Sequence, residues 1–207
     1  LYGSLGNDIL DGGAGNDLMN GGAGQDTVVY SAATSGVTVN LALTGWQSVG
    51  GGMGVDLLTV IENVTGSRYA DRLTGTSAAN VMSAGAGNDV LLGGDGNDAF
   101  YGDLGNDTLD GGAGDDVLWG QAGNDLMMGR GGADTFVFQA GFGSDLITDW
   151  ENGIDRIRIN GGATYNDISD LTIRNAGGHA AISFGGTTIT LLGVSVAQID
   201  ASDFNFV

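Results

Sequence analysis

The sequence predicts an all-β fold, a parallel β-roll: a flattened right-handed β-helix with two nine-residue repeats per coil, closed by a C-terminal antiparallel β cap. Three observations support this prediction. A nine-residue pattern recurs along the chain, 41 of the 207 residues are glycine, and one place in the pattern is almost always aspartate. Because glycine permits positive φ, the pattern is typical of very short strands joined by tight turns.

The repeat is clearest near the N-terminus, where residues 12–20 spell GGAGNDLMN and residues 21–29 spell GGAGQDTVV. Residues 3–11 carry the same pattern. A second array runs without a break, in units that begin at Gly66, Gly75, Ala84, Gly93, Gly102, Gly111, Gly120 and Gly129. A further unit at 140–148 follows after a two-residue slip, and an isolated copy occupies 51–59.

Two places of the repeat keep their residue type from unit to unit. The sixth place is Asn80 in one unit and otherwise aspartate: Asp8, Asp17, Asp26, Asp56, Asp71, Asp89, Asp98, Asp107, Asp116, Asp125, Asp134 and Asp145. The eighth place is always apolar: Leu10, Met19, Val28, Leu58, Leu73, Met82, Leu91, Phe100, Leu109, Leu118, Met127, Phe136 and Ile147. Each unit therefore predicts a turn and then a short strand whose middle side chain, in the eighth place, points into the core.

Two units make one coil, so unit n stacks on unit n+2 about 4.8 Å away. The sixth-place carboxylates then form columns, in which charges about 5 Å apart repel by roughly 0.8 kcal/mol even in water. The few apolar side chains of each coil do not easily offset both this repulsion and the entropy lost in ordering the backbone, so the columns require a cation. Calcium fits best because it accepts about 6–8 oxygen ligands, carbonyls included, in flexible geometry. One histidine and no cysteine leave zinc and copper without ligands.

The nonapeptide resembles the RTX calcium-binding repeat. The resemblance implies that carbonyls of the first four residues of each unit and the sixth-place aspartates bind calcium between stacked turns. It implies about six ions, in the pairs Gly3 with Gly21, Ala84 with Gly102, Gly93 with Gly111, Gly102 with Gly120, Gly111 with Gly129, and Gly120 with Ala140. The implied ligand residues are Gly3, Leu5, Asp8, Asp17, Gly22, Gly24, Asp26, Ala84, Ala86, Asp89, Gly93, Asp95, Asp98, Gly102, Asp103, Leu104, Gly105, Asp107, Gly111, Gly112, Ala113, Gly114, Asp116, Gly120, Gln121, Ala122, Gly123, Asp125, Arg130, Gly132, Asp134, Gly141, Gly143 and Asp145.

Other aspartates are left open as ligands. The units at Gly66 and Gly75 have Tyr69 and Ala78 where the family has glycine, so they are expected to begin the main roll. The pattern does not decide whether calcium also binds to Asp56, Asp71, Asn80, Asp149 and Asp155.

We expect four segments: a first roll segment at 1–29, a hairpin or coil insertion at 30–65 that includes the isolated repeat, the main roll at 66–148, and a cap at 149–207. Residues 37–41 alternate like a half-buried strand. In the cap, strands at 171–174, 181–184 and 188–192 are expected to form an antiparallel meander over the exposed end of the roll.

Two segments of the C-terminal region carry their own resemblances. Residues 146–157 resemble the segment that closes the roll in serralysin-type secreted proteases and mannuronan epimerase modules. Within it, Asp149 and Asp155 are either ligands of a further ion or turn and cap residues. Asp203 precedes a mostly apolar run that ends at Val207, which resembles the uncleaved secretion signal of proteins exported by type I systems.

Composition excludes several function classes. The net charge is −19 and lysine is absent, so nucleic acid is not an expected partner. No apolar run approaches the roughly 18 residues of a membrane span, so no membrane insertion is expected. No HExxH sequence or nucleophile elbow is present, and the single histidine, His179, is expected in a turn.

The expected function is that of a non-catalytic, calcium-binding module of a larger bacterial protein, with any catalytic domain upstream. Extracellular calcium would drive its folding, and the C-terminus would engage the type I secretion machinery, which places the protein outside the cell or at its surface. Two alternatives stay open. One is a polysaccharide-binding module of a secreted carbohydrate-active enzyme, and the other is a structural segment of a surface-layer or adhesin protein.

Overall fold

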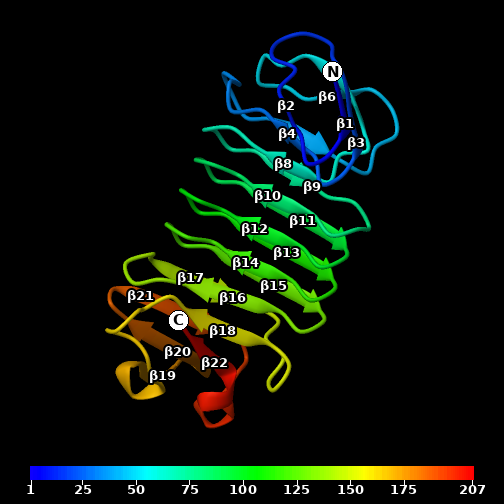
Figure 1. Cartoon of the computed structure of the whole chain (residues 1–207). Coiled ribbons are helices and arrows are strands. Elements are labelled where there is room, and N and C mark those ends of the chain that lie inside the picture. Colours follow the sequence, from blue (N-terminus) through cyan, green and yellow to red (C-terminus); the bar gives the residue numbers. More distant parts are fainter.

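The computed structural model describes residues 1–207, which form 22 strands and three short 3-10 helices. The strands stack as successive coils from the N-terminus at one end to the cap at the other (Figure 1). The predicted all-β parallel roll is therefore confirmed. No helix of the structure has the length and apolar character needed to cross a membrane.

One side of the roll is a single nine-stranded sheet in which every neighbouring pair is parallel. Its strands, in spatial order, are β2 (Ile9–Leu10), β4 (Thr27–Val29), β8 (Asn63–Thr65), β10 (Val81–Ser83), β12 (Ala99–Tyr101), β14 (Val117–Trp119), β16 (Thr135–Phe138), β18 (Arg156–Ile159) and β22 (Phe204–Phe206). In the unbroken part of the main array a strand residue pairs with the residue 18 positions later, for example Phe100 with Leu118, and the spacing grows to 20 between β15 and β17. Unit n thus stacks on unit n+2, as predicted.

The other side consists of two sheets. The first contains β1 (Tyr2–Leu5), β3 (Leu18–Ala23), β7 (Val55–Thr59) and β6 (Gln47–Ser48). The second contains β5 (Thr38–Asn40), β9 (Arg72–Thr74), β11 (Val90–Asp95), β13 (Thr108–Ala113), β15 (Leu126–Gly131), β17 (Ser144–Ile147), β21 (Thr187–Leu191), β20 (His179–Phe184) and β19 (Thr172–Ala176).

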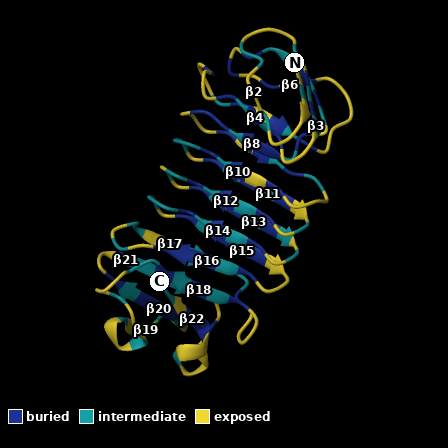
Figure 2. Ribbon diagram, in the orientation of Figure 1, coloured by how far each residue is buried: buried dark blue, intermediate teal, exposed yellow.

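The core follows the eighth place of the repeat. All thirteen eighth-place side chains are buried, with exposed fractions of 0 to 4%. The stack of buried strands between exposed turns is visible in Figure 2. The predicted inward orientation of this place is confirmed, and Ile157 and Ile189 continue the core into the C-terminal region.

Residues 30–50 insert a strand into one side of the roll. Strand β5 lies parallel to β9 and its Val39 is fully buried, while β6 pairs antiparallel with β7. The expected strand at 37–41 is therefore present, and it is part of the stack. The two sheets on this side of the roll are not paired with each other.

The cap combines parallel and antiparallel pairing. β19, β20 and β21 form the expected antiparallel meander, and β21 also pairs parallel with β17. The three 3-10 helices lie in this region, at η1 (Ile168–Asp170), η2 (Val196–Gln198) and η3 (Ala201–Asp203). His179, expected in a turn, begins β20, and its Nδ1 accepts a hydrogen bond from the Gly193 N–H. Beyond residue 148 the parallel stack continues through β18 and β22.

Candidate metal sites

The sixth-place side chains form two columns along the roll. The backbone N–H of one sixth-place residue donates to Oδ1 of the aspartate in the next coil at 2.6–2.9 Å. For example, the Asp89 N–H donates to Asp107, and the Asp107 N–H donates to Asp125. One oxygen of each such carboxylate therefore ties two coils together.

The Oδ2 atom of most sixth-place carboxylates is buried and has no hydrogen-bond partner. This holds for Oδ2 of Asp8, Asp17, Asp26, Asp89, Asp98, Asp107, Asp116 and Asp125. A buried carboxylate oxygen without a donor is costly, and a bound cation removes that cost.

Burial also raises the pKa of the array carboxyls in the metal-free fold. The pKa rises from 3.8 to about 6 in Asp89, Asp98 and Asp116, and to about 7 in Asp107, Asp134 and Asp145. Removal from water is the largest cause in each case. These carboxylates therefore lack sufficient compensating charge from the protein itself.

Several of the unpartnered oxygens lie beside a carbonyl of the next coil. A Cβ on Gly93 would overlap both Asp98 Oδ2 and the carbonyl oxygen of Gly111. The same arrangement recurs at Gly3, Gly102 and Gly111. Oxygens of two coils thus converge where the first-place glycine leaves room, and carboxylate and carbonyl oxygens are the ligands that calcium takes.

The ligands that the RTX resemblance implies lie in stacked turns. The six pairs stack through Ser4 with Gly22, Ala86 with Leu104, Gly94 with Gly112, Leu104 with Ala122, Gly112 with Arg130, and Gly123 with Gly143. The first unit of each pair holds one of the unpartnered oxygens. No three His, Cys, Asp or Glu side chains form a metal-binding cluster, so the chemistry of these sites depends on backbone carbonyls around single carboxylates.

A different geometry occurs in the units at Gly66 and Gly75. The Ser67 N–H donates to Asp71 Oδ2 and the Ser67 hydroxyl donates to Asp71 Oδ1 at 2.8 Å. Likewise, the Thr76 N–H and hydroxyl donate to Asn80 Oδ1. Protein donors therefore satisfy these two sixth-place side chains. We call units of this kind closed, and we call the units with an unpartnered carboxylate oxygen open.

The second place has a different backbone in the open units and in the units at Gly66 and Gly75. In the open units this residue has positive φ even where it is not glycine, namely in Ser4 (83°), Asp103 (67°) and Gln121 (66°). Ser67 and Thr76 are not among the residues with positive φ. Left-handed backbone is unfavourable for residues other than glycine, so these three open turns hold strain that the turns at Ser67 and Thr76 lack.

Protein donors also satisfy three other aspartates that the sequence leaves open. The Tyr30 hydroxyl donates to Asp56 Oδ2 at 3.0 Å. Asp149 accepts from the N–H groups of Gly129 and Arg130, and Asp155 accepts from those of Asp134 and Glu151. These bonds favour turn and cap roles for Asp149 and Asp155. Asp134 and Asp145 also continue the columns, since each accepts a backbone N–H from the preceding coil.

The fifth place carries a second column that the sequence analysis does not identify. The side-chain oxygen of a fifth-place Asn accepts the backbone N–H of the next coil, as from Asn106 to Asn88 and from Asn124 to Asn106. In these bonds the later coil donates to the earlier one, whereas in the carboxylate bonds the earlier coil donates to the later one. Each coil is therefore bonded in both directions along the roll. The signal in the sequence was the frequency of Asn or Asp in that place, from Asn7 to Asn124.

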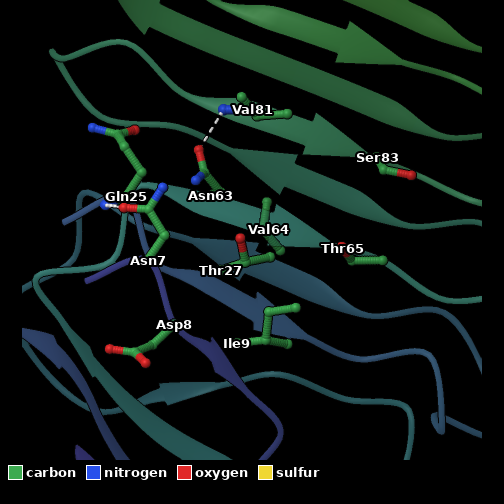
Figure 3. Close-up of a pocket in the computed structure, with 10 residues that line it drawn as sticks. All are labelled: Asn7, Asp8, Ile9, Gln25, Thr27, Asn63, Val64, Thr65, Val81 and Ser83. Carbon is green, nitrogen blue, oxygen red and sulfur yellow. Dashed lines mark hydrogen bonds between the residues drawn. The ribbon is translucent and has the colours of Figure 1, made fainter. Parts of the chain in front are cut away.

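An open groove of about 400 Å³ lies on the outer side of the first strands of the nine-stranded parallel sheet (Figure 3). Its lining includes the amides of Asn7, Gln25 and Asn63 and the hydroxyls of Thr27 and Thr65. The Asn63 side chain accepts the Val81 N–H at 2.8 Å, which fixes one wall.

Several solved structures are similar to this chain, and they include one lipase and two epimerase subunits. The extracellular lipase LipA of Serratia marcescens is 22% identical, with a TM-score of 0.35, and the match covers 96% of this chain but 38% of the lipase. Two subunits of the Azotobacter vinelandii mannuronan C5-epimerase also match. AlgE6R3 is 25% identical (TM-score 0.39, 66% of this chain and 78% of the subunit), and AlgE6R2 is 22% identical (TM-score 0.41, 70% and 92%).

No curated protein matches the chain significantly. The family profile described as RTX calcium-binding nonapeptide repeat (4 copies) matches residues 1–28, 65–100 and 101–136. These ranges coincide with the first segment and with the main array whose buried carboxylates lack protein donors. The chain therefore carries RTX calcium-binding nonapeptide repeats, folded as a parallel β-roll.

Proposed function

We propose that this chain is a structural, non-catalytic module whose folding is driven by calcium and which supports the secretion and stability of a larger protein. The observation that carries the proposal is the set of buried carboxylate oxygens without a protein partner. An ion bound to the folded chain and not to the unfolded chain stabilises the fold in proportion to the logarithm of its concentration.

The charge of the chain supports the same conclusion. The net charge is −19, and the only ion pair in the fold joins Arg130 to Asp110. About six calcium ions would neutralise twelve of these charges. Low cytosolic calcium would then leave the chain unfolded, and the higher concentration outside the cell would fold it.

The C-terminal segment links folding to export. In the folded chain, Asp203 is 2% exposed and accepts the Asp200 N–H, and β22 pairs with β18. A secretion machinery that recognises this segment would need it free of the sheet. Export of an unfolded chain in low calcium, followed by folding outside, satisfies that requirement.

Circular dichroism in excess EGTA and then in a calcium titration tests the proposal. We expect little β-sheet signal in EGTA, a cooperative gain with calcium, and no such gain with magnesium at the same ionic strength. Equal β-sheet content in EGTA and in millimolar calcium would contradict calcium-driven folding.

The groove of Figure 3 supports a second candidate function, the binding of an extracellular polysaccharide. Its amide and hydroxyl groups are suited to hydrogen bonding with sugar hydroxyls. Affinity electrophoresis in alginate and in neutral glycans tests this candidate. If the groove binds glycan, Gln25→Ala should lose the retardation, whereas Gln139→Ala, an exposed residue outside the groove, should keep it.

A further inference from the structure

The segment Val60–Glu62, which lies outside the nonapeptide pattern, stacks on the unit at Gly21. The N–H groups of Glu62 and Asn63 donate to the Asp26 carbonyl, and β8 then pairs with β4. Val60 has φ of 53°, in the left-handed region. That conformation is rare for a β-branched side chain, and such strain often marks a functional turn.

The strained turn brings the Val60 carbonyl to the position that a first-place carbonyl occupies in the main array. A Cβ on Gly21 would overlap both Val60 O and Asp26 Oδ2. At Gly93, the corresponding atoms are Gly111 O and Asp98 Oδ2. The two places therefore have the same arrangement of a carboxylate oxygen and a carbonyl from the next coil, although Val60 belongs to no repeat.

Asp26 is the second observation that points to a ligand. Its side chain is 0% exposed, its Oδ1 accepts the Asp8 N–H at 2.8 Å, and its Oδ2 has no partner. Glu62 takes the role of the missing sixth-place aspartate, because its Oε2 accepts the Asp26 N–H at 2.9 Å. The stacked turns at Gly3 and Gly21 have a carboxylate oxygen of their own, because Asp8 Oδ2 lies beside them. Asp26 Oδ2 is therefore left for the turn at Val60.

We propose that Asp26 Oδ2 and the Val60 carbonyl hold an additional calcium ion, in a site formed by one repeat and one non-repeat segment. The proposal rests on calcium binding by the open units. The ion joins the first roll segment to the segment that leads into the main roll, and it compensates for the strained backbone at Val60.

Native mass spectrometry of the full chain in calcium, with the bound ions counted, tests the site. Asp8→Asn and Asp26→Asn should each bind one ion fewer than the wild type, and the double variant should bind two fewer. Asparagine at 26 keeps the oxygen that accepts the Asp8 N–H. Asp71→Asn is the matched control, because Ser67 already donates to that carboxylate, and it should retain the full count.

The proposal is overturned if Asp26→Asn keeps every ion, or if the double variant loses only one, because both carboxylates would then serve a single site. A crystal of the wild-type chain grown in calcium gives a test without substitutions. Anomalous density beside Asp26 Oδ2 and Val60 O supports the site. Density in the main array but none at Asp26 overturns this site alone, and density nowhere overturns the proposed function as well.

Discussion

The closed units at Gly66 and Gly75 have the same strands and stacking as the open units that follow them. They differ in whether the protein itself donates hydrogen bonds to the sixth-place side chain. Leu73 and Leu91 are both fully buried and pair in adjacent parallel strands. Yet the side chain of Asp71 is closed by Ser67, while Asp89 Oδ2 has no partner. Serine in the second place, with ordinary backbone geometry, supplies the donors that the open turn lacks. The sixth-place carboxylate of this coil can therefore be compensated either by a second-place serine or by a bound ion.

The largest expected effect is that of pH on the buried sixth-place carboxyls of the metal-free chain. Several of these carboxyls have pKa values of about 6 to 7 in the fold, against about 3.9 in an unfolded chain. The folded state therefore binds more protons, and stability is present at low pH and is lost as the pH rises through 6 to 7. In EGTA, the β-sheet signal in circular dichroism should therefore be larger at pH 5 than at pH 8. A β-sheet signal in EGTA that grows from pH 5 to pH 8 would contradict this prediction.

Asp107→Asn compares an open unit with the closed control Asp71→Asn. At free calcium 100 times the dissociation constant, loss of one site removes about 2.7 kcal/mol. At low calcium, where this site is mostly empty, the same variant should be no less stable than the wild type, because a neutral amide replaces a buried charge. Asp71→Asn resembles the natural Asn80 and should change the calcium dependence little. Denaturant unfolding at several calcium concentrations that keep the chain folded measures both variants, and equal calcium dependence in the two would refute the distinction.

Tyr30→Phe converts a closed carboxylate into an unpartnered one. The Tyr30 hydroxyl is the donor to Asp56 Oδ2, and both residues are buried. Its removal should destabilise the fold by about 2 kcal/mol. Part of that loss should be recovered on adding calcium if an unpartnered oxygen in this turn is enough to attract the ion. Thermal melts at low and at saturating calcium measure the loss, and an unchanged Tm at both concentrations would show that the hydroxyl is not needed.

Ser67→Ala removes the hydroxyl from a closed unit and keeps its backbone donor. The side-chain bond to Asp71 is lost while the Ser67 N–H still donates, so the expected cost is about 1 kcal/mol, at any calcium concentration. Thr76→Ala is the milder companion, since its acceptor is the neutral amide of Asn80. A Ser67→Ala cost that appears only at low calcium would mean that calcium already binds this unit.

The regular part of the fold could be predicted because two places of the repeat carry separate physical roles. The eighth-place side chains fix the inner face and the 18-residue coil, and the buried Leu91 and Leu109 pair as expected. The insertion could not be placed, because strand β5 joins the stack through backbone pairing with β9 and follows no repeat. Nor does any pattern indicate that Val60 adopts left-handed backbone and places its carbonyl beside Asp26.

The dependence of unfolding free energy on free calcium tests the central claim most directly. If the open carboxylates are calcium sites, the free energy of unfolding rises with the natural logarithm of calcium concentration, with a slope equal to RT times the number of ions taken up on folding. The expected slope corresponds to about six ions or more. A slope near zero in a chain that is fully folded in EGTA would contradict the account.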